Sequence, residues 1–200
     1  MSIIIYEKVD FINLLDDIRL TSSDIENSST LTNYKRISTK NGAAEAVYPL
    51  AMVPPFYRFI IENNRLPEQE EYWDTLMLEY KLFAGKDITS IPQEIYEGYK
   101  SRALSRTYPS QIRDLHLNLK LKETVPPNVK IVYNTVLDLE VGIDVLIIDE
   151  RNKHPIRIGL CLYIDSYKSN KERERKKGKW RPYHNFIYRE VPIKINYEDN

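Results

Sequence analysis

The first half of the chain has the hydrophobic spacing of amphipathic helices. Between Tyr6 and Leu20, apolar residues recur every three or four positions, which predicts a helix. The segment from Thr21 to Thr39 is rich in Ser, Thr and Asn, which indicates a loop or a mobile linker. The pattern predicts further helices from Phe56 to Asn63, from Pro67 to Ala84, from Pro92 to Arg106, and from Tyr108 to a stop at Pro126.

Beyond Pro126 the period changes to that of strands. Val141 to Ile148 is an almost continuous hydrophobic run, as expected for a strand buried on both faces. The polar stretch from Asp149 to Pro155 indicates a tight turn, so this run and the next should form a hairpin. Pro192 lacks a backbone N–H, which predicts an edge position for the last strand. The predicted strands are Val129–Tyr133, Val141–Ile148, Ile156–Ile164 and Phe186–Ile195.

These patterns predict an α+β protein. Its N-terminal half is helical, and its C-terminal half is a mixed sheet of about four strands with flanking helices. We divide the chain into a helical region, residues 1–107, and an α/β core, residues 108–200, and expect the two to form one compact unit. From residue 108 the predicted order is helix, three strands, a basic helix or loop, and a strand.

Composition restricts the classes of function. Six glycines in 200 residues argue against a glycine-rich phosphate loop. Cys161 is the only cysteine, which excludes an internal disulfide and a thiolate-rich zinc site. No apolar stretch approaches the ~20 residues that span a bilayer, and the N-terminus lacks the basic leader of a signal peptide. We therefore expect a cytoplasmic protein with no membrane partner.

The strongest local motif is Gly142-Ile143-Asp144, which opens the hydrophobic strand. A carboxylate beside an apolar strand costs free energy unless it has a partner. Asp144 either lies at a strand end and accepts hydrogen bonds from the backbone or an arginine, or binds a hard divalent cation, which prefers carboxylate oxygens. The local sequence leaves both interpretations open.

This motif and its context resemble the PD-(D/E)XK nuclease superfamily. In that family a core of helix, three strands, helix and strand positions a strand aspartate, and the next strand supplies an acidic residue and, two positions on, a lysine. The resemblance covers residues 108–195 and its local motif is short. It implies a restriction endonuclease-like core that hydrolyses phosphodiesters, with DNA as substrate and Mg²⁺ as cofactor.

The third predicted strand departs from the family pattern, because it contains no acid-any-lysine triplet. The nearest substitute, Asp165-Ser166-Tyr167-Lys168, is one residue longer and follows the strand. The resemblance then implies that Asp144, Asp165 and Lys168 are the catalytic residues. Asp144 and Asp165 would hold Mg²⁺, and Lys168 would stabilise charge on the phosphate oxygens.

Residues outside these two strands offer additional ligands. Asp114, on the preceding helix, could complete the metal shell. Asp138 and Glu140 are alternatives just before the strand, or are solvated turn charges. Arg113, His116 and Lys120, on the same helix as Asp114, form a polar stripe on one face because they are three and four residues apart. This stripe faces either a phosphate or solvent.

The segment between Lys168 and Arg181 has eight positive and two negative charges, although the formal net charge of the chain is zero. Lysine and arginine neutralise phosphates and release counterions, whereas a charge run can also be a solvated surface. The candidate nucleic-acid-binding residues are Lys171, Arg173, Lys176, Lys177, Lys179 and Arg181, with Arg113 on the helix.

Three functional hypotheses follow. The first is a Mg²⁺-dependent DNA endonuclease, acting as a homodimer or larger assembly if it cuts both strands. The second is a non-catalytic nucleic-acid-binding relative. The third is a protein-interaction module of a mobile element or defence system, in which the basic run meets an acidic partner. Salt-sensitive DNA binding separates the first two from the third.

Overall fold

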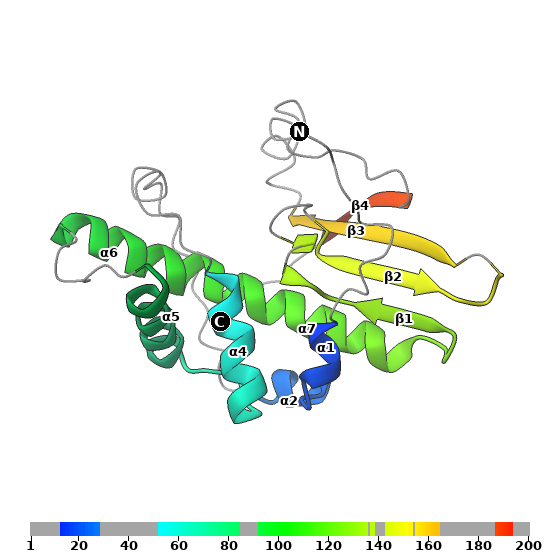
Figure 1. Ribbon diagram of the computed structural model, residues 1–200, viewed down its shortest axis with the longest axis horizontal. Helices are drawn as coiled ribbons and strands as arrows, with labels where there is room; N and C mark the ends of the chain where they lie inside the picture. Colours follow the sequence, from blue (N-terminus) through cyan, green and yellow to red (C-terminus); the bar gives the residue numbers. More distant parts are fainter. Residues whose placement is uncertain are drawn as a thin grey trace, which may run out of the picture. The chain divides into compact units, whose positions relative to one another are not determined.

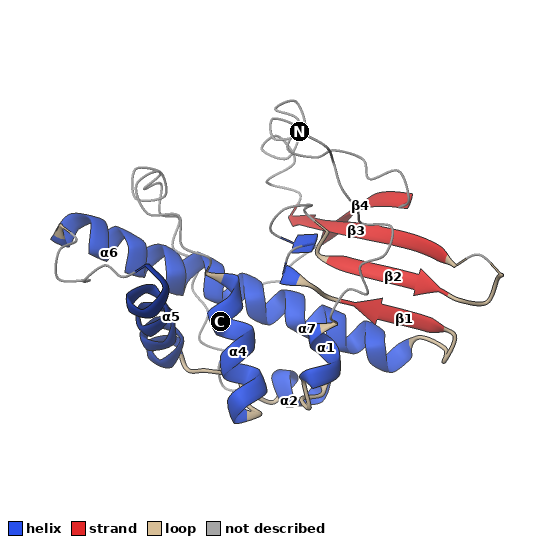
Figure 2. Cartoon of the chain, viewed as in Figure 1, coloured by secondary structure: helices blue, strands red, loops and turns tan. Residues whose placement is uncertain are grey.

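The fold is of the α+β class, as the sequence predicted (Figures 1 and 2). A computed structural model describes residues 13–28, 52–84, 92–135, 137–138, 143–153, 155–164 and 187–193. Two compact units divide the chain: a sheet unit, residues 1–16 and 124–200, and a helical unit, residues 17–123. Among the helices in the described ranges, none is long and apolar enough to cross a membrane.

The helices of the helical unit begin and end with recognisable signals. Prolines occupy the first turn of α4, where their missing N–H groups need no partner. α4 ends at Asn63, and the next residue, Asn64, has a φ of 52°, the left-handed conformation common just after a helix. The helices are α2 (Ser22–Glu26), α4 (Val53–Asn63), α5 (Gln69–Ala84), α6 (Gln93–Arg102) and α7 (Tyr108–Thr124), and α1 (Leu14–Asp17) crosses the boundary between the units.

An aromatic cluster joins α4, α5 and α7. The ring centroids of Phe56 and Tyr72 are 6.1 Å apart, and those of Tyr72 and Tyr108 are 5.5 Å apart. Both tyrosine hydroxyls donate to backbone carbonyls, Tyr72 to Met52 at 2.7 Å and Tyr108 to Pro67 at 2.6 Å. Burial raises the pKa of Tyr72 above its ordinary value. The cluster therefore buries large rings without leaving these hydroxyls unsatisfied.

The prediction of a loop from residue 21 to residue 39 is wrong for α2. Thr21 and Asp24 form a capping box: the Asp24 N–H donates to Thr21 Oγ1 at 3.2 Å, and the Thr21 N–H donates to Asp24 Oδ2 at 2.8 Å. The carboxylate of Glu123 accepts from the Ser22 N–H at 2.7 Å. Residues that are common in loops here start a short helix, and a partner on α7 stabilises it.

Two other helix predictions need correction. The expected break before Pro109 is absent, because α6 continues into α7 through a π-helical segment, Ala103–Thr107. Pro109 has no N–H for the Ser105 carbonyl, and the wider turn absorbs the change in register. Of the predicted helix from residue 6 to residue 20, the described part contains only α1, and residues 18–20 are not helical.

The sheet unit consists of strands in the order β1-β2-β3-β4 (Figure 1). β1, β2 and β3 form an antiparallel meander, in which Val132 pairs with Leu146 and Val145 with Leu160. β4 runs parallel to β3, with Ile164 beside Ile193. The strands are β1 (Val129–Val132), β2 (Val145–Asp149), β3 (Ile156–Ile164) and β4 (Ile187–Ile193).

The first two residues of β2 are buried, one on each face, as the sequence predicted for this strand, whereas Ile147 and Ile148 are half-buried. Val145 and Leu146 point to opposite faces and are both fully buried. On one face Leu146 belongs to a hydrophobic cluster with Val132, Leu137 and Ile143. Because a shift of one residue would exchange the two faces, this packing fixes the register of β2.

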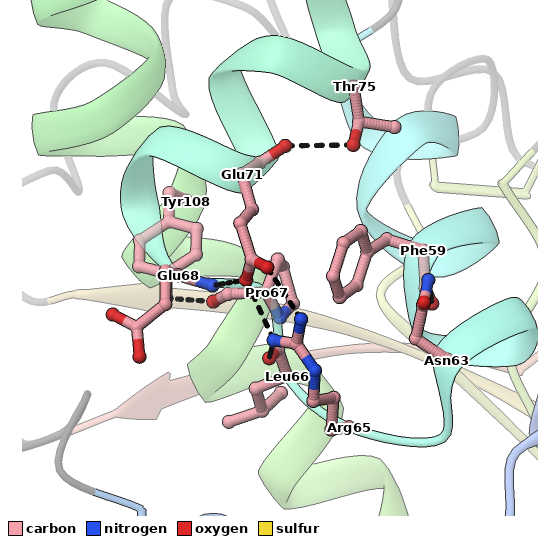
Figure 3. A network of polar contacts seen from close by, with 9 residues as sticks. All are labelled: Phe59, Asn63, Arg65, Leu66, Pro67, Glu68, Glu71, Thr75 and Tyr108. Atoms are coloured by element: carbon pink, nitrogen blue, oxygen red, sulfur yellow. Dashed lines mark hydrogen bonds and ion pairs between the residues drawn. The ribbon is translucent and has the colours of Figure 1, made fainter.

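A charged loop connects α4 to α5 (Figure 3). Arg65 donates to both carboxylate oxygens of Glu71, at 2.7 and 2.5 Å, and lies 4.9 Å from the ring centroid of Phe59. Glu71 also accepts from the Glu68 N–H at 2.8 Å, which satisfies a donor at the start of α5. These hydrogen bonds lower the pKa of Glu71 to about 2, and the bond from Arg65 has the largest effect.

We expect Glu71→Gln to destabilise the helical unit by about 0.5–1 kcal/mol at pH 7, because the amide keeps the Glu68 contact and loses the charged pair. The folded pKa of Glu71 is depressed, so its contribution is present above its unfolded pKa and is lost as pH falls towards 2. Thermal melts followed by circular dichroism should therefore show a difference from wild type that shrinks between pH 5 and pH 2. A constant difference over that window, or the same trend in the exposed control Glu94→Gln, would contradict this assignment.

Candidate functional site

Asp144 lies at the start of β2, one residue before the strand. Its backbone N–H donates to the Leu160 carbonyl at 2.9 Å, so β3 holds the main chain there. The residue is half-buried, and the next two residues are fully buried. Asp144 therefore occupies the strand-end position that the sequence offered, where a carboxylate stands between the core and solvent.

A closed loop precedes Asp144 and places a second acid nearby in the chain. The Ile143 N–H donates to the Leu137 carbonyl at 2.9 Å. Asp138 follows Leu137 and Asp144 follows Ile143, so each acid is next to one of the two residues joined by this hydrogen bond. Asp138 accepts a hydrogen bond of 2.7 Å from the hydroxyl of Tyr133, which is buried. Of the two alternatives considered before the strand, Asp138 thus has a fixed position, and Glu140 lies outside the described residues.

Close packing fixes this end of β2. The side chain of Ile143 lies over Gly159 of β3, and a Cβ at Gly159 would be only 2.7 Å from Ile143 Cδ1. Any larger residue at position 159 would push Ile143 away from the sheet. Because Gly159 has no side chain, Ile143, the residue before Asp144, can pack closely against β3.

Strand register brings three strand ends to the edge where Asp144 lies. β1 ends beside Leu146, and β3 runs past Leu160 to Ile164 in the opposite direction to β2. The C-terminal end of β4 lies at the same edge, because β4 is parallel to β3. β3 thus ends, at Ile164, on the side of the sheet where β2 begins, and Asp165 is the next residue in the sequence.

Most of the predicted site residues lie outside the part of the chain that the structure describes. This holds for both remaining catalytic candidates and for the candidate phosphate contacts of the basic segment. These residues are Asp165, Lys168, Lys171, Arg173, Lys176, Lys177, Lys179 and Arg181. Their assignments stay predictions.

Asp114 and Arg113, on α7 in the helical unit, contact each other. Asp114 Oδ1 accepts from Arg113 Nε at 2.9 Å and from Nη2 at 2.7 Å. Asp114 is 8% exposed. A metal at Asp114 or a phosphate at Arg113 would therefore have to share or replace this ion pair, and both roles stay predictions.

The other members of the α7 polar stripe contact α2. Glu26 Oε1 lies 2.9 Å from His116 Nε2 and 3.3 Å from Lys120 Nζ. These contacts, that with His116 first, hold the pKa of Glu26 below its ordinary value. In this structure His116 and Lys120 serve helix docking within the helical unit.

α7 also carries a buried polar row that was not predicted from the sequence. Gln111 and Asn118 are 5% and 0% exposed and lie on the same side of the helix as Asp114, because the spacings are three and four. Asn118 Nδ2 donates to the Asp114 carbonyl at 2.8 Å, and Gln111 Oε1 has no hydrogen-bond partner among the described residues. The signal was present as polar residues at helical spacing between apolar ones.

Neither a metal-binding group of side chains nor similarity to known proteins identifies the site at Asp144. Within the described ranges, no group of three or more His, Cys, Asp and Glu side chains is placed to hold a metal ion. No family model, curated protein or solved structure matches the chain. The site at Asp144 therefore rests on its own residues and on the strand register.

We expect Gly159→Ala to reduce the free energy of unfolding by about 1–3 kcal/mol, because the new methyl group collides with Ile143. Ile143→Val removes the colliding Cδ1 atom, at its own cost of about 0.5–1.5 kcal/mol. In a double-mutant cycle measured by urea denaturation, the double variant should be more stable than the sum of the single effects predicts. Strict additivity would show that the two residues do not contact each other.

Proposed function

We propose that this protein is a nuclease-like protein that acts on nucleic-acid phosphodiesters, with DNA as substrate, Mg²⁺ as cofactor and Asp144 as its central carboxylate. The observation that carries the proposal is the position of Asp144. It directly precedes the strand β2 at the end of the sheet where β3 also ends, and Asp165 and the basic segment follow β3 in the sequence. A phosphodiester site needs an acid and clustered cations at one place.

The order and direction of the strands support a restriction endonuclease-like core. Helix α7 precedes three antiparallel strands, and the last strand pairs in parallel with β3. The PD-(D/E)XK superfamily has a core of helix, three strands, helix and strand, and the order of α7 and the four strands agrees with it.

The residues have distinct roles in this proposal. Asp144 and Asp165 would hold Mg²⁺, which supplies polarisation of the phosphate and activation of a water. Their carboxylate oxygens are the ligand type that this cation prefers. Lys168 would neutralise charge that develops on the phosphate oxygens. The lysines and arginines up to Arg181 would bind the nucleic-acid backbone.

One observation favours the non-catalytic alternative. β3 runs from Ile156 to Ile164 and contains neither an acid nor a lysine within those bounds. In the family this strand supplies both groups. A protein that keeps the sheet and the basic segment but lacks these groups would bind nucleic acid without cutting it.

We expect the wild-type protein to nick or cut plasmid DNA with Mg²⁺ or Mn²⁺, and Asp144→Asn to reduce cleavage at least about 100-fold. DNA binding should survive, because the variant removes one carboxylate and no cation. The matched control is Asp149→Asn, at the other end of β2, where the carboxylate pairs with Arg151. This control should cut as wild type does.

The outcomes separate the hypotheses. Equal cleavage by wild type and Asp144→Asn would remove Asp144 from the mechanism. DNA binding without cleavage by the wild type would support the non-catalytic alternative. Failure of the wild type to bind DNA at low salt would exclude both and leave the protein-interaction hypothesis.

DNA affinity should fall linearly with salt on logarithmic axes, because each phosphate contact releases counterions. The triple variant Lys176→Ala/Lys177→Ala/Lys179→Ala should bind more weakly at low salt. Its salt slope should be smaller by about one for each lysine that contacts a phosphate. Lys153→Ala, in the exposed turn between β2 and β3, is the charge control and should bind as wild type. Fluorescence anisotropy with a labelled duplex measures both, and equal slopes for all three proteins would contradict the basic segment as the contact.

A further inference from the structure

The end strand of the described sheet, β1, bonds to more than β2. Its side away from β2 presents backbone groups of Ile131 and Tyr133, which form hydrogen bonds with Asn13 and Leu14 at the start of α1. Asn13 Nδ2 donates to the Ile131 carbonyl at 3.1 Å, and the Tyr133 N–H donates to Asn13 Oδ1 at 3.1 Å. The Leu14 N–H donates to the Tyr133 carbonyl, also at 3.1 Å.

The Asn13 side chain takes the place of a peptide group in an added strand. A primary amide carries an acceptor and a donor in one plane, as a backbone amide pair does, and here both face β1. Further bonds fix its orientation: Nδ2 also donates to Asp16 Oδ1 at 3.1 Å, and Oδ1 accepts from the Leu15 N–H at 3.3 Å. Leu15 is fully buried and anchors the segment.

We propose that Asn13 is an edge cap: its amide occupies the outer side of β1 and keeps this edge from pairing with β1 of a second copy of the chain. Unpaired strand edges are templates for further strands, and native proteins cover them. The proposal does not depend on the proposed nuclease activity, because it rests only on hydrogen bonds along β1.

Without the Asn13 amide, a second copy of β1 is the partner that fits the outer side of β1, where it would also compete with the Leu14 N–H for the Tyr133 carbonyl. Antiparallel pairing about Ile131 would place each Lys130 opposite Val132 of the other copy, so no like charges would face each other. Such a pair has twofold symmetry, and the same backbone groups serve both copies. Three of the four residues of β1 are β-branched, which suits a paired strand.

The test compares full-length Asn13→Ala and Asn13→Asp with wild type. The aspartate can still accept from the Tyr133 N–H but places negative charge against the Ile131 carbonyl. Asn63→Ala is the matched control, because Asn63 Nδ2 donates to a carbonyl in its own helix, that of Phe59. Analytical ultracentrifugation over a range of concentrations measures dimer formation, and hydrogen exchange reports the Tyr133 amide.

We expect Asn13→Ala to dimerise with an apparent Kd about tenfold or more below that of wild type, with Asn13→Asp in between. At low concentration the Tyr133 amide of Asn13→Ala should exchange about tenfold faster, and protection should return as concentration rises. Asn63→Ala should match wild type in both measurements.

Two results would overturn the proposal. One is an Asn13→Ala or Asn13→Asp variant that stays monomeric while Tyr133 exchange is independent of concentration. The other is association that leaves the Tyr133 amide unprotected, because the contact would then lie elsewhere. If Asn13→Ala does not fold, the same two readouts on Asn13→Asp decide.

Discussion

The packing of Ile143 against Gly159 determines where β2 begins, and the account of the site depends on that point. Because Gly159 has no side chain, Ile143 can lie against β3 and join the cluster with Val132 and Leu146. The next residue, Asp144, is therefore held at the boundary between core and solvent. A shift of one residue would carry Asp144 to the other face and break the burial of β2 on both sides.

Strand patterns predicted most of the sheet. The bounds of β3 were predicted correctly, and β1 and β4 differ from prediction by one or two residues at their ends. β2 was predicted from Val141 but begins at Val145, and the strand-end position of Asp144 was one of two open interpretations of the sequence. The hairpin of β2 and β3 followed from sequence. These features were predictable because a doubly buried strand has a composition that little else shares.

The errors come from contacts that sequence spacing does not reveal. α2 was predicted as a loop because Ser and Thr are common both in loops and at helix starts. The helix is stabilised in part by a hydrogen bond from the Ser22 N–H to the distant Glu123 carboxylate. The helix through Pro109 needs a π-helical segment, which local propensity does not predict. The engagement of His116 by Glu26 joins residues 90 positions apart. Long-range polar contacts of this kind decide whether a charged stripe is available to a ligand.

The central claim is that Asp144 marks a metal and phosphate site at one edge of the sheet. Paramagnetic broadening of backbone amide signals by Mn²⁺, in the presence of a short DNA duplex, tests it directly because the effect falls steeply with distance from the ion. We expect strong broadening at Asp144 and at Ile164, where β3 ends, with little at Asp149 and Ile156, at the opposite end of the hairpin. Broadening centred on Asp149 and Ile156, or none that is specific, would contradict it.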